Sequence, residues 1–144
     1  MNKLRKFLAE RTVGYVLSAT AALCAFVVAA IYGACFWTDA ERFSFVAFLL
    51  PLVGGVAFTA LGIFRPTAPF APAVLAVCLY VALLQFLSHQ VIYLSDVFYG
   101  GVTAAAISSL DGGFSACFLL LLIGGGLSVA GIFMKMYRRA EDEE

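Results

Sequence analysis

The polar residues that could best take part in chemistry or binding lie on one apolar stretch in the second half of the chain. Gln85, His89, Tyr93 and Asp96 recur at steps of three or four residues, which places them on one face of a helix. A histidine titrates near neutral pH, and glutamine and tyrosine can orient a solute through hydrogen bonds. This face is therefore a candidate binding site for a small solute or ion.

The same residues also have a structural interpretation. His89 and Asp96 lie within two turns of the outer end of the stretch, where water and headgroups can satisfy them, and Gln85 can bond a neighbouring helix. Gln85 is the deepest of the set, so the site hypothesis depends most on it.

Catalytic and metal-binding patterns are missing from the sequence. It contains no GxSxG, HExxH, GxxxxGK[ST] or GxGxxG motif, and the deep parts of its apolar stretches lack a carboxylate or lysine. Four cysteines without a CxxC pair and a single histidine do not match the usual zinc spacings. We expect neither an enzyme nor a metal site nor a cofactor.

The elements that carry these residues are membrane-spanning helices. Of the 144 residues, 63% are hydrophobic and 12% charged, far from the balance of a soluble domain. Four charge-free runs are each long enough to cross a bilayer, and backbone groups in lipid must be paired within a helix. The sequence predicts an all-α, four-helix transmembrane bundle with spans at about 13–37, 43–64, 70–94 and 114–134.

Lysine and arginine set the expected orientation. Eight of the nine lie before the first span, between the second and third, or after the fourth, and only Arg42 lies on the other side. Both termini, with the tail 135–144, should therefore be cytoplasmic, and 38–42 and 95–113 should be outside. No basic face is left for nucleic acid.

Spans two and four match each other without gaps at an offset of 69 residues. Six small residues recur in the pattern Gly-x3-Thr/Ser-x2-Gly, which favours close helix packing: Gly55, Thr59, Gly62, Gly124, Ser128 and Gly131. Spans one and three match more weakly at an offset of 61. Duplication of one helical hairpin and chance similarity both explain these matches, and the former implies a twofold axis along the membrane normal.

The outer connection leaves two questions open. The uncharged segment 97–110 is too short to span the bilayer, so it either re-enters the membrane or forms an ordinary outer loop with a short surface helix. Cys35 and Cys117 fall at similar outer depth and could pair or stay free.

Two segments carry a family resemblance. Ile92-Tyr-Leu-Ser-Asp-Val-Phe98 and Leu110-Asp-Gly-Gly-Phe-Ser115 resemble small four-span membrane proteins of gut-associated bacteria, a family without an assigned activity. The resemblance implies a bacterial cytoplasmic-membrane location and a role for the outer end of span three.

The leading hypothesis is an oligomeric membrane protein that offers a pathway or binding site for a small solute or ion, open to the outside around Gln85, His89 and Tyr93. The alternative is an accessory subunit that packs through its glycine faces against a larger membrane transporter or assembly. The lipid bilayer is a partner in both cases.

Overall fold

The computed structural model describes residues 12–64 and 66–134, and every regular element within these two ranges is a helix. They are α2 (Val13–Phe36), α3 (Phe45–Ile63), the 3-10 helix η1 (Ala68–Phe70), α4 (Ala71–His89), α5 (Val91–Val97), α6 (Ala104–Ser108) and α7 (Gly112–Ile132). The predicted tail 135–144, Arg65 and the basic residues before Thr12 lie outside the described residues.

Four of these helices are long and apolar enough to cross a membrane: Val13–Phe36, Phe45–Ile63, Ala68–His89 and Gly112–Ile132. The all-α, four-span fold class expected from composition is thereby confirmed, and the chain is a multi-pass membrane protein. We call the end of the bundle that holds residues 37–44 and Asp111 the outer end, after the orientation expected from the charges.

Local sequence explains where the spans begin. Ser44 precedes α3 and its hydroxyl accepts the Ala47 N–H at 3.3 Å, and Asp111 precedes α7 and its carboxylate accepts the Gly113 N–H at 3.4 Å. Both residues cap donors that have no partner within the helix. Proline stands in the first turns of both η1 and α4, where no backbone donor is required.

The third span differs from the continuous helix expected over 70–94. Helix α4 ends at His89, Gln90 leaves helical geometry at φ −97° and ψ 1°, and α5 resumes at Val91. Gln90 is 0% exposed, and its side chain is hydrogen bonded to Arg42. The helix is therefore interrupted at the residue whose polar side chain points into the bundle. A hydropathy pattern cannot reveal such a break.

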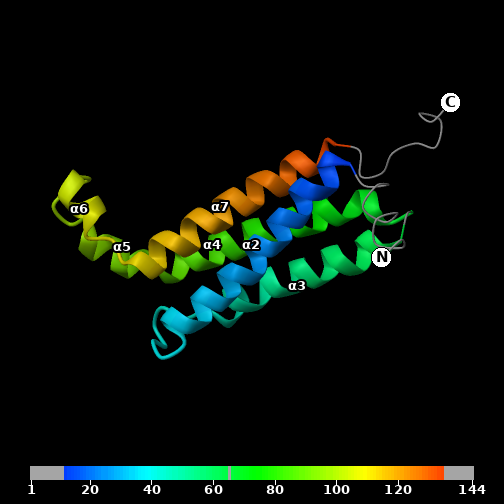
Figure 1. The fold of residues 1–144 in the computed structure, drawn as a ribbon. Coiled ribbons are helices and arrows are strands. Elements are labelled where there is room, and N and C mark those ends of the chain that lie inside the picture. Colours follow the sequence, from blue (N-terminus) through cyan, green and yellow to red (C-terminus); the bar gives the residue numbers. More distant parts are fainter. Residues whose placement is uncertain (1–11, 65, 135–144) are drawn as a thin grey trace.

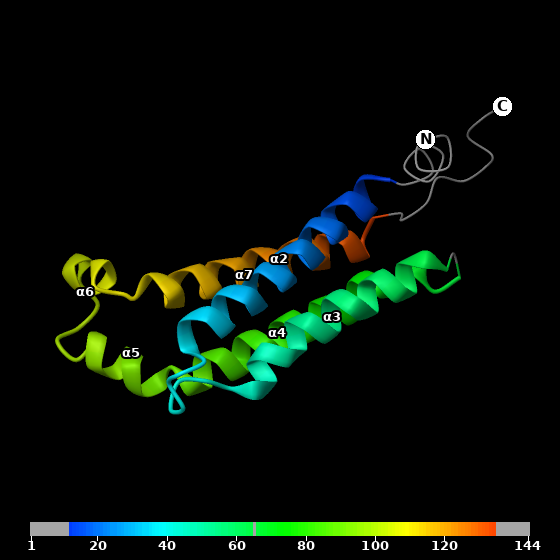
Figure 2. The same ribbon diagram turned by 60° about the horizontal axis from the view of Figure 1, so that its bottom comes forward.

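The four spans form a bundle in which α2 packs most closely with α7 and α3 with α4 (Figures 1 and 2). Smaller contacts join α4 to α7 and α2 to α3, while α2 and α4 barely touch. The start of α2 and the end of α7 lie together at the inner end (Figure 1). The short helices α5 and α6 extend beyond the outer end of the bundle.

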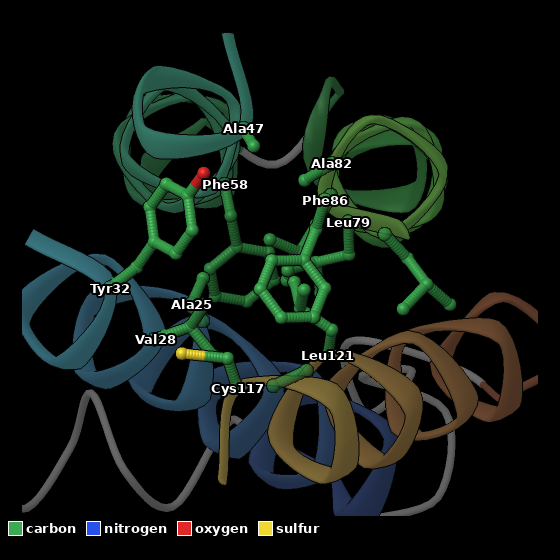
Figure 3. Packing of buried hydrophobic residues seen from close by; sticks show 14 of the residues in the cluster. Ala25, Val28, Tyr32, Ala47, Phe58, Leu79, Ala82, Phe86, Cys117 and Leu121 are labelled. Carbon is green, nitrogen blue, oxygen red and sulfur yellow. The ribbon is translucent and has the colours of Figure 1, made fainter. Parts of the chain in front are cut away.

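Side chains from all four spans fill the centre of the bundle. Figure 3 shows Tyr32, Phe58, Phe86, Leu79 and Leu121 pointing into the same space between the helices. All five are at most 2% exposed. These side chains fill the space between the helices at the depths where they lie.

Small residues bring the backbones of neighbouring helices together. Gly55, Gly62, Gly124, Ser128 and Gly131 are buried, and the Ser128 hydroxyl donates to the Pro72 carbonyl of α4 at 2.7 Å. Thr59 is different, because it is exposed and its hydroxyl donates to Val56 O in its own helix at 2.7 Å. These small faces are occupied within one chain, so they are not free to receive a second subunit.

Close glycine contacts also show how the two hairpins are related. A Cβ on Gly54 would lie 2.7 Å from the Cβ of Cys78, and a Cβ on Gly124 would lie 3.3 Å from the Cβ of Cys24. Likewise, Gly55 faces the ring of Phe26, and Gly125 faces the ring of Tyr80. Adding 70 to a residue number in α3 gives the equivalent position in α7, and adding 54 to one in α2 gives the equivalent position in α4. By this rule the Gly54–Cys78 contact corresponds to Gly124–Cys24, and Gly55–Phe26 corresponds to Gly125–Tyr80.

This relationship is that of a twofold axis along the bundle. It relates the α2–α7 interface to the α3–α4 interface, which are the two larger ones, and the α4–α7 interface to the α2–α3 interface, which are the two smaller ones. The registers differ from those read in the sequence, where the offsets were 69 and 61. In the register of the contacts, Gly54 is equivalent to Gly124 and Gly55 to Gly125, so each hairpin has a Gly-Gly pair at the same place.

The packing predicts that Gly54→Ala destabilises the protein by about 1–3 kcal/mol, because the added methyl meets the Cβ of Cys78, which cannot rotate away. Gly124→Ala should destabilise less, since its nearest neighbour is farther away. The free energy of unfolding in mixed micelles measures both effects. Gly126→Ala, with nothing within 4 Å of the new Cβ, is the control and should change stability by less than about 0.5 kcal/mol. Equal stability of the Gly54 and Gly126 variants would contradict this packing.

Candidate functional site at the outer end

The loop between α2 and α3 holds Arg42 in place through its backbone. The Tyr32 hydroxyl donates to the Arg42 carbonyl at 3.1 Å and accepts the Ser44 N–H at 2.7 Å. The Arg42 N–H donates to the carboxylate of Asp39 at 3.3 Å. Tyr32 itself is 1% exposed, so a buried helix residue anchors the loop from below.

The Arg42 guanidinium reaches across the outer end of the bundle. Its Nε donates to Gln90 Oε1 at 2.9 Å, and Gln90 Nε2 donates back to the Arg42 carbonyl at 3.5 Å. The guanidinium lies 4.7 Å from the ring centroid of Phe36 and 4.2 Å from that of Tyr93. Each cation–π contact of this kind contributes about 0.5–2 kcal/mol, depending on solvation.

Asp111 completes this arrangement from the start of α7. One of its carboxylate oxygens lies 3.6 Å from Arg42 Nη2, which is buried and forms no hydrogen bond within the described residues. The Asp111 N–H donates to the Tyr93 hydroxyl at 2.6 Å. We call Arg42, Gln90, Tyr93 and Asp111 the Arg42 clamp. It ties the α2–α3 loop, the α4–α5 break and the start of α7 together.

A cavity of about 210 Å³ opens beside the clamp. It is lined by Asp39, Glu41, Arg42, His89, Ile92, Tyr93 and Asp96. The side chains of Glu41, His89 and Asp96 are exposed at its rim, whereas Asp39, Arg42 and Tyr93 are partly buried. The cavity therefore lies at the surface and opens outward.

Charge in the cavity is unbalanced toward the negative. The only ion pair in residues 12–64 and 66–134 joins Arg42 to Asp111, which does not line the cavity. Asp39, Glu41 and Asp96 have no such partner in these ranges. Arg42 is thus already neutralised, and three carboxylates remain around the opening.

The structure brings together three of the four residues predicted for the site. His89, Tyr93 and Asp96 line the cavity, whereas Gln85 is half-buried one turn deeper in α4 and is not part of the lining. Because Gln90 interrupts the helix, the face predicted for an unbroken helix does not run continuously from Gln85 to Asp96.

Several residues of the site were not identified from the sequence. Arg42 entered the sequence analysis only to orient the chain, and Gln90, Asp39 and Glu41 did not enter it. Asp111 stands before Gly112 and Gly113, a position that indicates a turn or a helix cap but not an ion pair, and it does cap α7. One signal was available, since Arg42 is the only basic residue in the predicted outer connections and a charge at a membrane boundary needs a counter-charge. Its partners could not be selected without the fold.

Other candidate chemistry is limited. Cys24, Cys35, Cys78 and Cys117 are free thiols, with Cys35 exposed and Cys117 buried, so the pairing left open for Cys35 and Cys117 is not formed. Within the described parts of the chain, no three His, Cys, Asp or Glu side chains are grouped so that they could hold a metal ion.

Comparison with protein-family models, curated proteins and solved structures finds no match to this chain.

Replacing Gln90 tests the clamp. Gln90→Leu keeps the volume but leaves Arg42 Nε without its acceptor, which should lower stability by about 1–3 kcal/mol and speed hydrogen exchange in residues 41–44. Thermal unfolding in detergent and hydrogen-exchange mass spectrometry measure these changes.

Gln85→Leu is the matched control, because the same substitution then falls outside the clamp and the cavity. Gln90→Glu restores an acceptor and should recover most of the lost stability. If the two leucine variants behave alike, the clamp does not hold the outer end together.

Proposed function

We propose that this membrane protein binds a small organic cation, such as an amine or quaternary ammonium compound, in the cavity at its outer end. The observation that carries the proposal is the lining: three carboxylates without an ion-pair partner in residues 12–64 and 66–134 surround an open space beside Arg42, whose charge is compensated by Asp111. An excess of one charge sign in a concave site attracts ligands of the opposite sign.

The size and composition of the cavity favour an organic ion. A volume of about 210 Å³ exceeds the space that a bare ion needs. Ile92 and Tyr93 supply apolar surface beside the carboxylates, as ligand sites for small molecules commonly do.

Binding fits the described bundle better than conduction through a single chain. The centre below the cavity is filled by Tyr32, Phe36 and Phe86, all at most 1% exposed. A pathway would therefore have to form between chains or after these rings move. Association with further copies stays a prediction, and it would use surfaces other than the small-residue faces that pack α2 against α7.

The location of the protein is part of the proposal. The charge asymmetry and the family resemblance support a bacterial cytoplasmic membrane with both termini inside, which places the cavity on the external face.

An accessory role in a larger membrane assembly is the second candidate. It is favoured by the clamp, in which Arg42, Gln90, Tyr93 and Asp111 mostly satisfy one another without any ligand.

Binding of choline to the purified protein in nanodiscs tests the first candidate by calorimetry. Its neutral isostere 3,3-dimethylbutan-1-ol should not bind measurably, because it lacks the charge. Asp96→Asn and Glu41→Gln should each weaken choline binding by about two- to fivefold, as expected for a carboxylate at the solvent-exposed rim.

Gln85→Leu is the control and should leave the affinity unchanged, since Gln85 does not line the cavity. Equal binding of choline and the alcohol, or no effect of either carboxylate substitution, would contradict a cation site. Absence of choline binding together with recovery of a stoichiometric membrane partner would favour the accessory role.

A further inference from the structure

Residues 91–110 form an arm in which several apolar side chains have no partner in the bundle, while Tyr93, Leu94 and Leu110 pack partly against the core. Neither α5 nor α6 contains a buried residue. Tyr99 is 94% exposed, Val102 78% and Ile107 54%. Apolar side chains gathered in this way indicate a surface that meets something other than water.

The arm is also nearly free of charge. Asp96 is the only charged residue between Val91 and Leu110, and the segment 97–110 has none. An outer loop exposed to water would ordinarily carry more charge and fewer aliphatic side chains. The composition therefore favours an environment of lower polarity.

The three hydroxyl side chains in and next to α6 are hydrogen bonded locally. The Ser108 hydroxyl donates to Ala105 O at 2.8 Å and the Ser109 hydroxyl to Ala106 O at 2.7 Å, while Thr103 accepts the Ala106 N–H at 3.2 Å. Gly101, at φ +98°, makes the turn between the two helices. These hydrogen bonds lower the free-energy cost of moving the hydroxyl groups out of water.

The position of the arm matches the boundary of the bilayer. The third span, Ala68–His89, has 22 residues, and a helix of that length covers about 33 Å, which accounts for the hydrocarbon layer. Helix α5, with 7 residues, rises at most about 10 Å beyond it, and the interfacial layer on one side of a bilayer is about 5–8 Å thick, so the arm begins within that layer. Figures 1 and 2 show the arm at this end, with α6 near the start of α7.

The apolar surface is continuous with the surface that must face lipid. Leu84 on α4 is 67% exposed, and Val91 extends this surface onto α5 at 59%. Lipid that covers the outer half of α4 therefore meets the first turn of the arm directly.

We propose that the arm is an interfacial anchor, in which Tyr99, Val102 and Ile107 insert into the headgroup–acyl boundary of the outer leaflet. This places segment 97–110 at the membrane surface, neither crossing into the hydrocarbon core nor projecting into water. Since the arm has no basic residue, its insertion depends on apolar burial and is independent of anionic lipid. The anchor also holds Ile92, Tyr93 and Asp96, one wall of the cavity, at a fixed depth.

Tryptophan fluorescence tests the depth of the arm, because Trp37 is the only tryptophan in the chain. The double variant Trp37→Phe, Tyr99→Trp carries one reporter at the tip of the arm, and Trp37→Phe, Ile107→Trp carries one on α6. Each is reconstituted in phosphatidylcholine vesicles with bromine at defined acyl positions, and aqueous iodide is added in a separate titration.

We expect both reporters to be quenched by bromine near the headgroup end of the acyl chain, at least as strongly as native Trp37, and only weakly by iodide. Adding phosphatidylglycerol should leave the quenching unchanged. Thermal unfolding of each variant verifies that the bundle is intact.

Strong iodide quenching without bromine quenching would overturn the proposal by placing the arm in water. Quenching by neither agent would also overturn it, and would indicate that protein, such as a second copy of the chain, covers the arm. Quenching mainly by bromine near the bilayer centre would contradict the interfacial depth and indicate a re-entrant loop. None of these outcomes depends on whether choline binds.

Discussion

The outer end of this bundle depends on one cation at the membrane boundary. Arg42 lies between the rings of Phe36 and Tyr93, binds the fully buried Gln90 and is paired with Asp111. A charge at this depth is tolerated only when nearby groups replace the water it has lost. Gln90, the buried partner of Arg42, stands at the break in the third span, and Ile92, Tyr93 and Asp96 of α5 line the cavity just beyond it. The candidate site is thus built around the groups that pair this single arginine.

Below this clamp, the bundle is held by close backbone approach and aromatic packing. In lipid, association of helices is not driven by transfer of apolar surface from water, so small residues and good packing must supply the attraction. The twofold relation shows the same solution used twice, with a Gly-Gly pair of each hairpin packed against a cysteine and an aromatic ring of the other spans. The hairpins differ at their outer ends, because the second carries the α5–α6 arm between its helices. That asymmetry creates the cavity wall.

Prediction from the sequence succeeded where one physical requirement dominated. Four long uncharged runs could only be helices, and Ser128, predicted to lie on a close packing face, is buried against α4. It was less successful where several arrangements satisfied the same pattern. Gln85 and Gln90 are both glutamines near the end of one span, but only Gln90 reaches Arg42. In the alignment of spans two and four, an offset of 69 residues pairs more identical residues than an offset of 70 does. The close glycine contacts in the structure nevertheless relate α3 to α7 by 70 residues.

The sequence by itself determined the class of protein, the number of spans and the region of the outer end that holds polar residues. These follow from hydropathy and local backbone pairing, which act over one helix at a time. Only the tertiary structure decided which helices are neighbours, which polar residues meet and where the third span breaks. Those features depend on contacts between residues as distant as Arg42 and Gln90, and a sequence pattern does not encode which of several compatible partners will lie within reach.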